Sequence, residues 1–171
     1  MTDLKSLIRE VPDFPKPGIN FYDITTLLKD PKGLQQAIGA LADQFRPLDC
    51  DVVLGVEARG FIFAAPVAVT LGAGFIPLRK PGKLPWKTVR HEYELEYGID
   101  SLEAHADAVP PGGKILIVDD VLATGGTAWA AAELVRRLNG TVVGWSFLLS
   151  ITGLKGERRL TGAPVHTVVP L

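Results

Sequence analysis

Cysteine is nearly absent from this chain, which has one, Cys50, among its 171 residues. A single cysteine excludes an intrachain disulfide framework and a cysteine-based metal cluster. It also suits a reducing compartment, so we expect a cytoplasmic location. The three histidines, His91, His105 and His166, show no metal-ligand spacing. We expect them to be structural or exposed.

The chain also lacks an excess of either charge and a secretory segment. Its 18 basic and 19 acidic residues give a net charge of −1, so we expect no nucleic-acid partner. The first ten residues, MTDLKSLIRE, are charged and lack the apolar centre of a signal peptide. With 47% hydrophobic and 22% charged residues, the composition is that of a globular protein, and the length fits one domain over residues 1–171.

One uncharged stretch, residues 61–78, is just long enough to raise the question of a membrane span. Pro66, Gly72, Gly74 and Pro77 interrupt it. This punctuation favours a buried helix over 61–71, a glycine turn and a strand over 75–78. We therefore expect no membrane partner.

Strands alternate with helices along the sequence, which predicts an α/β fold with a mainly parallel sheet. A helix is expected at residues 3–10, and Asp30 followed by Pro31 predicts an N-cap and a first helical residue. The other expected elements are a proline-rich loop at 12–20, an extended or helical piece at 21–28, strands at 51–55, 92–97, 115–118, 141–149 and 165–169, a basic loop at 80–91, and helices at 101–108 and 128–138.

Residues 115–127, ILIVDDVLATGGT, are the most informative stretch. The apolar quartet predicts a buried strand, and Asp119 and Asp120 follow it at the edge where open α/β sheets bind ligands. Gly125 and Gly126 have no Cβ, so backbone amides can approach an anion closely at the positive end of the next helix. The turn as a whole comprises Ala123, Thr124, Gly125, Gly126 and Thr127.

The acid pair and the glycine turn suit different parts of one ligand. Carboxylates repel a phosphate but suit ribose hydroxyls or Mg²⁺, whereas amides and threonine hydroxyls suit a phosphate. The plainer alternative is that the glycines serve turn geometry alone, but the adjoining acids favour a ribose 5-phosphate site. The chain has neither the lysine of a Walker motif nor a G-x-G-x-x-G run.

This stretch resembles the phosphoribosyl pyrophosphate motif of type I phosphoribosyltransferases. The resemblance extends over nearly the whole chain and is closest to the adenine-specific members. It implies a twisted, mainly parallel sheet flanked by helices, with a mobile flap and a small hood from the N-terminal segment. The other matching segments are FPKPGINFYDIT at 14–25, GVEARGF at 55–61, LRKPGKLP at 78–85, LEYG at 95–98 and SITGLKG at 150–156.

The resemblance implies a purine salvage enzyme that works on small-molecule substrates. Adenine and 5-phosphoribosyl 1-pyrophosphate would give AMP and pyrophosphate through an oxocarbenium-like transition state. Mg²⁺ would be carried by the pyrophosphate and ribose rather than by a set of protein ligands. A homodimer is implied in the same way.

The resemblance assigns the pyrophosphate to Arg59, Arg79 and Lys83. A guanidinium suits a pair of phosphate oxygens, and small neighbours flank Arg59 in its turn. The basic loop over 80–91 suits a flap that excludes water from a reactive ribosyl cation. An ordinary surface arginine and a solvated charge run are the plainer alternatives.

Glu92, Glu94 and Glu96 lie two residues apart, which is typical of one face of a strand. We expect Glu92 and Glu94 to face solvent. Glu96 and the two residues after it match the catalytic flap of the family. The resemblance therefore implies that Glu96 is the general acid/base for the proton on the purine imidazole.

The purine itself is assigned by resemblance to Phe21, which would stack on one face, and to Ile151 on the other. Asn20 and Tyr22 adjoin Phe21, at positions where relatives commonly carry an aliphatic and a basic residue. A 6-oxopurine substrate, hypoxanthine, guanine or xanthine, therefore stays open as an alternative. A non-catalytic sensor of the sugar pyrophosphate is a further alternative, although about fifty residues before the first core strand show no basic recognition helix.

Overall fold

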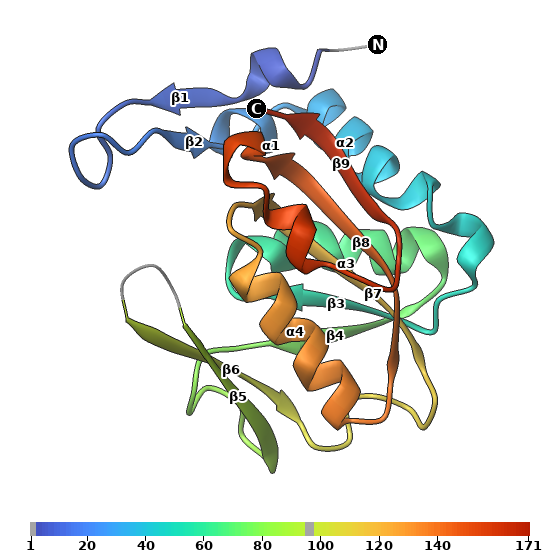
Figure 1. The fold of residues 1–171 in the computed structure, drawn as a ribbon. Coiled ribbons are helices and arrows are strands. Elements are labelled where there is room, and N and C mark those ends of the chain that lie inside the picture. The colour runs from blue at the N-terminus through green and yellow to red at the C-terminus, as the bar shows by residue number, and fades with distance from the viewer. Residues whose placement is uncertain (1–2, 95–97) are drawn as a thin grey trace.

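A five-stranded parallel sheet forms the centre of the computed structural model, which describes residues 3–94 and 98–171 (Figure 1). The strand order is β4-β3-β7-β8-β9, and every neighbouring pair is parallel. This confirms the predicted fold class. The strands are β3 (Val52–Val56), β4 (Gly74–Leu78), β7 (Lys114–Leu122), β8 (Thr141–Ser150) and β9 (Val165–Pro170).

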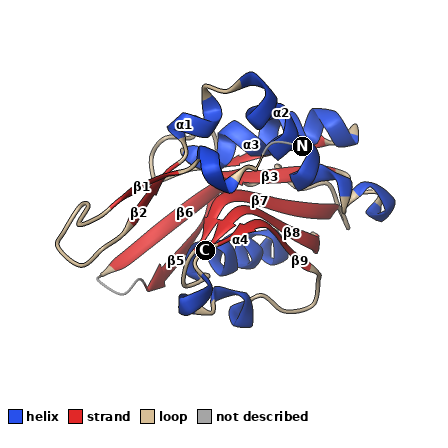
Figure 2. Cartoon of the chain, turned by 90° about the horizontal axis from the view of Figure 1, so that it is seen from above, coloured by secondary structure: helices blue, strands red, loops and turns tan. Residues whose placement is uncertain are grey.

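Helices cover both faces of this sheet. Figure 2 shows α1, α2 and α3 on one side and α4 on the other. Asp30 caps α2 as predicted, since its side chain accepts a 2.6 Å hydrogen bond from the Gly33 N–H. The helices are α1 (Thr25–Leu28), α2 (Pro31–Asp43), α3 (Arg59–Leu71) and α4 (Gly126–Arg137), with 3-10 turns at Lys5–Leu7, Arg46–Leu48, Thr152–Leu154 and Gly156–Arg159.

Alternation along the strands divides the core into two layers. Val53 and Leu116 pack in the layer with α2 and α3, whereas Leu54 and Ile117 pack in the layer with α4. All four side chains are fully buried. Because both faces of a parallel sheet are covered, its strands are apolar at nearly every position.

Two antiparallel hairpins project from the same side of the molecule (Figure 1). One pairs β1 (Arg9–Val11) with β2 (Phe21–Asp23), and the other pairs β5 (Thr88–Glu94) with β6 (Ile99–His105). The β1–β2 hairpin forms the N-terminal hood. We call the β5–β6 hairpin the flap hairpin.

Three predicted elements are wrong, and all fall at these hairpins. The helix predicted at 101–108 is strand β6, which pairs with β5 over seven residues and buries Leu102 and Ala104 against α4. The helix predicted at 3–10 is a 3-10 turn followed by β1. The basic loop predicted to reach residue 91 ends sooner, because β5 begins at Thr88.

The uncharged stretch over 61–78 behaves as predicted. Helix α3 ends at Leu71, Gly72 takes a left-handed φ of 70° as its C-cap, and β4 follows. Within the described part of the chain, no helix combines the length and apolar character needed to cross a membrane.

Candidate active site

The acid pair lies on the central strand of the sheet. Strand β7 continues through Asp119 and Asp120 to Leu122, so the acids lie within the strand rather than beyond its end as predicted. The following turn leads into α4, and Gly125 adopts a φ of 80°. A Cβ on Gly125 would lie 2.5 Å from the carbonyl oxygen of Gly156. Glycine is therefore required here for both its conformation and its size.

Both carboxyl groups are buried, with 9% of Asp119 and 5% of Asp120 exposed. Burial raises the pKa of Asp119 well above its usual range, and the neighbouring Asp120 charge raises that pKa further. Burial also raises the pKa of Asp120, while the Arg59 guanidinium opposes this shift. The pair thus stores unfavourable charge that hydrogen-bonding partners in a ligand could relieve.

Arg59 opens helix α3 and lies between the acids and the hood. Its Nε is 2.8 Å from Oδ2 of Asp120, and its Cζ lies 5.3 Å from the centre of the Phe21 ring. A Cβ on Gly60 would lie 2.6 Å from Oδ1 of Asp119. The small residue after Arg59 therefore allows the β3–α3 turn to approach the acid pair.

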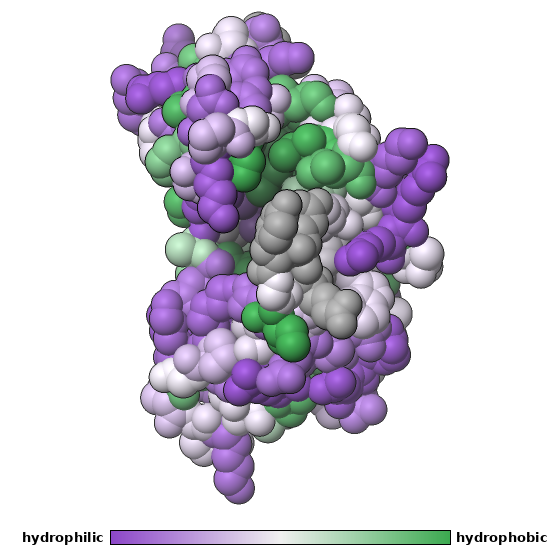
Figure 3. Space-filling model, turned by 60° about the vertical axis from the view of Figure 1, so that its left-hand side comes forward, coloured by the Kyte–Doolittle hydropathy of each residue, from purple (hydrophilic) through white to green (hydrophobic). Residues whose placement is uncertain are grey.

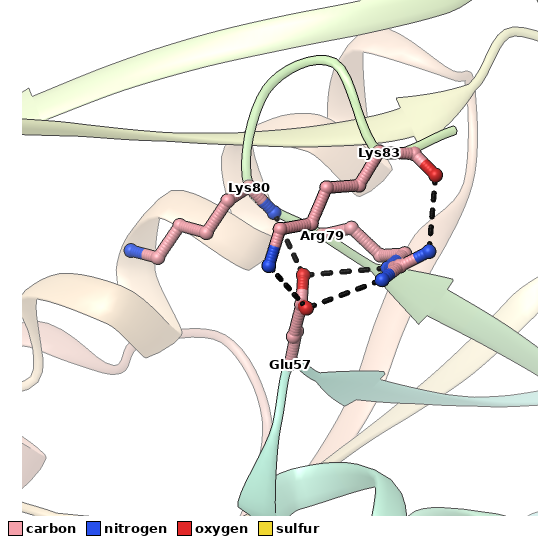
Figure 4. Close-up of polar contacts among 4 residues, drawn as sticks. All are labelled: Glu57, Arg79, Lys80 and Lys83. Atoms are coloured by element: carbon pink, nitrogen blue, oxygen red, sulfur yellow. Dashed lines mark hydrogen bonds and ion pairs between the residues drawn. The ribbon is translucent and has the colours of Figure 1, made fainter. Parts of the chain in front are cut away.

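The basic loop after β4 is anchored on Glu57, at the end of β3 (Figure 4). Arg79 and Lys83, both predicted to bind pyrophosphate, donate hydrogen bonds to this carboxylate. These bonds, Lys83 first, lower the pKa of Glu57 to about 2. Sequence analysis missed Glu57, although an acid within an anion-binding turn was a visible signal.

A second polar network joins the flap hairpin to the glycine turn. The Tyr93 hydroxyl lies 3.2 Å from Oδ2 of Asp100 and 3.4 Å from the hydroxyl of Thr127. Lys80 also forms an ion pair with Asp100. Burial raises the pKa of Tyr93. These residues were not predicted, because the alternation around residue 93 was analysed for its glutamates alone.

A cleft of about 410 Å³ lies where these elements meet. Both strand–helix turns line it, including residues 57–59 and 123–127, together with Lys80, Tyr93 and Asp100. Figure 3 shows apolar side chains gathered about a hollow in this side of the molecule, with hydrophilic side chains above and below it. Among the residues that the structure describes, no group of three or more His, Cys, Asp or Glu side chains could hold a metal ion.

The hood separates the predicted purine residues onto two faces. Phe21 lies under Arg59 and packs edge-on against Phe14, with ring centres 5.2 Å apart. Asn20 instead donates hydrogen bonds to Glu10 and, at 3.3 Å, to the Tyr22 hydroxyl. Side chains two apart on a strand share a face, so Asn20 and Tyr22 lie opposite Phe21.

The remaining two predicted residues lie elsewhere. Ile151 follows β8 and is half-buried, and its N–H donates to the carbonyl of Leu122 at 2.9 Å. This places Ile151 beside the end of the acid-bearing strand. Glu96 lies outside the described residues.

Comparison with known proteins gives the same picture. The model of the phosphoribosyl transferase domain matches residues 23–160. An adenine phosphoribosyltransferase from Solibacter usitatus is 60% identical over 169 residues, which cover 99% of this chain and 98% of the relative. One from Thermobifida fusca is 59% identical over 171 residues, with coverage of 98% and 97%.

Solved structures agree over the same length. Adenine phosphoribosyltransferase from Thermoanaerobacter pseudethanolicus has a TM-score of 0.96 at 50% identity, covering 99% of this chain and 98% of its own. The enzyme from Saccharomyces cerevisiae, solved with an imino-altritol bisphosphate and adenine, has a TM-score of 0.91 at 40% identity, with coverage of 97% and 96%. The chain belongs to the phosphoribosyltransferase family, among the adenine phosphoribosyltransferases.

Proposed function

We propose that the chain transfers the 5-phosphoribosyl group of 5-phosphoribosyl 1-pyrophosphate to N9 of adenine, giving AMP and pyrophosphate. The observation that carries this proposal is one cleft that combines a buried acid pair, a glycine turn at a helix N-terminus and several cations. The high identity to adenine phosphoribosyltransferases favours adenine over a 6-oxopurine.

The ribose 5-phosphate would bind along β7 and the turn after it. Asp119 and Asp120 would accept hydrogen bonds from the ribose hydroxyls, which relieves the burial of their charge. The amides of residues 123–127 would hold the 5-phosphate at the positive end of α4, helped by the hydroxyls of Thr124 and Thr127.

The pyrophosphate would lie among Arg59, Arg79 and Lys83. During the reaction the bond from C1′ to the pyrophosphate oxygen breaks, and its electron pair leaves with that oxygen. Positive charge then develops on the ribose, while the cations stabilise the departing anion. The buried acids beside the ribose lie on the side of the cleft where that positive charge develops.

The purine would stack on Phe21, with Ile151 on its other face and Asn20 and Tyr22 adjoining. N9 attacks C1′ and forms the new glycosidic bond. The proton that leaves the imidazole ring is proposed to pass to Glu96. Support for Glu96 comes from the LEYG segment at 95–98 alone.

Mg²⁺ is the proposed cofactor, carried by oxygens of the donor. The acid pair fits this role, because two carboxylates beside the ribose would offset the charge of a hard cation that prefers oxygen ligands. When bound, the ion neutralises part of the charge on the pyrophosphate.

We also propose a homodimer of single-domain chains in the cytoplasm. Ile62 and Val69 on α3 and Phe75 on edge strand β4 are exposed, Val69 by 82%. Apolar groups on an edge strand and its neighbouring helix favour contact with another chain. Sedimentation of the wild type and of Val69→Asp tests this, since the dimer predicts a shift toward monomer.

The activity is tested by incubating the purified chain with adenine, the donor and Mg²⁺ and measuring AMP by chromatography. Hypoxanthine, guanine and xanthine serve as competing bases in the same assay. AMP formation with a preference for adenine is expected. Turnover of a 6-oxopurine in preference to adenine would support the alternative, and no turnover of any purine would refute the enzyme.

A further inference from the structure

Glu57 is an acid in the part of the cleft expected to bind an anion. Its side chain is 13% exposed and lies at the start of the β3–α3 turn, two residues before Arg59. An unpaired carboxylate there would repel pyrophosphate. The partners of Glu57 show what it does instead.

Arg79 has all three guanidinium nitrogens engaged within the protein. Its Nε and Nη2 donate to the two oxygens of Glu57 at 3.3 and 3.2 Å, which forms a fork. Its Nη1 donates to the carbonyl of Lys83 at 3.0 Å. Its backbone also exchanges two hydrogen bonds with Glu103, at 3.0 and 2.8 Å. Arg79 is therefore held at both ends.

The two lysines of the same loop are held less fully. The Lys83 ammonium donates to Oε1 of Glu57 at 2.7 Å, and its side chain is 49% exposed. Lys80 donates only its backbone N–H to Glu57, at 3.2 Å. Its side chain points away from that carboxylate in Figure 4 and pairs with Asp100. A single exposed contact can be exchanged for a ligand without unfolding the loop.

We propose that Glu57 is a positioning residue of the donor site, which fixes Arg79 and the loop over residues 79–83 so that Lys83 can pass from Glu57 to the pyrophosphate. This rests on the proposed function and refines it. Arg79 acts through Glu57, and Lys83 supplies the contact with the ligand. With a pKa of about 2, Glu57 stays ionised at any assay pH near neutrality.

A double-mutant cycle tests this division of roles. Glu57→Gln and Arg79→Gln should each raise the KM for the phosphoribosyl donor about tenfold, and the double variant should be no worse than either. The KM for adenine should stay within about twofold, which a general loss of structure would not allow. Weaker binding of pyrophosphate by calorimetry should match the donor KM.

Arg79→Lys separates a fork from a simple charge, because lysine keeps the charge but cannot bind both oxygens of a carboxylate in one plane. It should behave like Arg79→Gln. This comparison holds even if Glu57→Gln does not fold. Glu133→Gln is the matched control, because it also removes an arginine–carboxylate fork, with Arg136 on α4, and it should leave both KM values unchanged.

Two results would overturn the proposal. One is a wild-type donor KM in Glu57→Gln. The other is an Arg79→Gln defect that Arg79→Lys rescues and that multiplies with the Glu57→Gln defect in the double variant, because Arg79 would then bind the pyrophosphate directly. Absence of turnover in the wild type would refute the proposed function instead, and pyrophosphate calorimetry on the same variants would still decide the role of Glu57.

Discussion

The donor-binding side of the cleft belongs to the parallel sheet, whereas the purine-binding side is built largely on a two-stranded hairpin. Strand β7 is covered on both faces and carries Asp119 and Asp120 at buried positions. The hood has two three-residue strands, and Phe21 is half-buried. A lone two-stranded hairpin is marginally stable in water, so the hood depends on contacts with the rest of the chain.

Arg59 joins the two sides. It is ion-paired with Asp120 on the sheet and lies over the Phe21 ring of the hood. The contrast predicts that changes at the donor side affect stability and catalysis together, whereas changes at the hood affect the base alone.

The largest expected effect is at the acid pair. In Asp119→Asn/Asp120→Asn, each lost charged hydrogen bond to ribose costs about 1.5–3 kcal/mol, so kcat/KM should fall about a thousandfold. Steady-state kinetics with both substrates measures this, with Asp43→Asn on the exposed end of α2 as the control. A loss below about tenfold would remove the pair from the ribose site.

A smaller loss is expected at Gly125, where stability and binding should fall together. Alanine at a φ of 80° and 2.5 Å from the Gly156 carbonyl forces the turn to move, at a cost of about 2 kcal/mol. The melting temperature should fall by about 4–8 °C, and the donor KM should rise. Gly153→Ala is the control, because no atom lies within 4 Å of its Cβ position. Equal melting temperatures for the two variants would contradict the argument.

The same contrast explains how far the sequence predicted the molecule. Strand β7, the glycine turn and α4 were predicted because apolar runs and glycines signal them locally. Residues 101–108, SLEAHADA, have helix-forming composition, yet seven pairings with β5 make them a strand. Glu57 was missed because its partners Arg79 and Lys83 are 22 and 26 residues away. Pairings over such distances are not visible in local patterns.

At the hood, Phe21→Ala should raise the KM for adenine about tenfold, because stacking of a base on an aromatic ring contributes about 1–3 kcal/mol. The donor KM should change less, by the cation–π contact with Arg59 alone. Phe21→Tyr keeps the ring and should stay near wild type. An equal rise in both KM values would place Phe21 outside the purine site.

Stability should respond to pH at the acid pair. The folded pKa of Asp119 is raised above 3.8, so the folded protein binds more protons than the unfolded chain and loses stability as pH rises through the folded pKa. Asp119→Asn lacks this loss. At pH 7–8 it should be about 1 kcal/mol more stable, or about 2–4 °C in melting temperature. The two melting curves should converge near pH 4, and a less stable variant at neutral pH would contradict the sign.

The smallest effects are expected on the far face of the hood, from Asn20→Ala and Tyr22→Phe. Their side chains bond to one another and Asn20 bonds to Glu10, on the face opposite Phe21. Loss of these exposed contacts should change stability by at most about 0.5 kcal/mol and leave the adenine KM within about twofold. Base-competition assays on both variants should keep the preference of the wild type. A change in the preferred purine would mean that the side chains beside Phe21, and not the stacking ring alone, select the base.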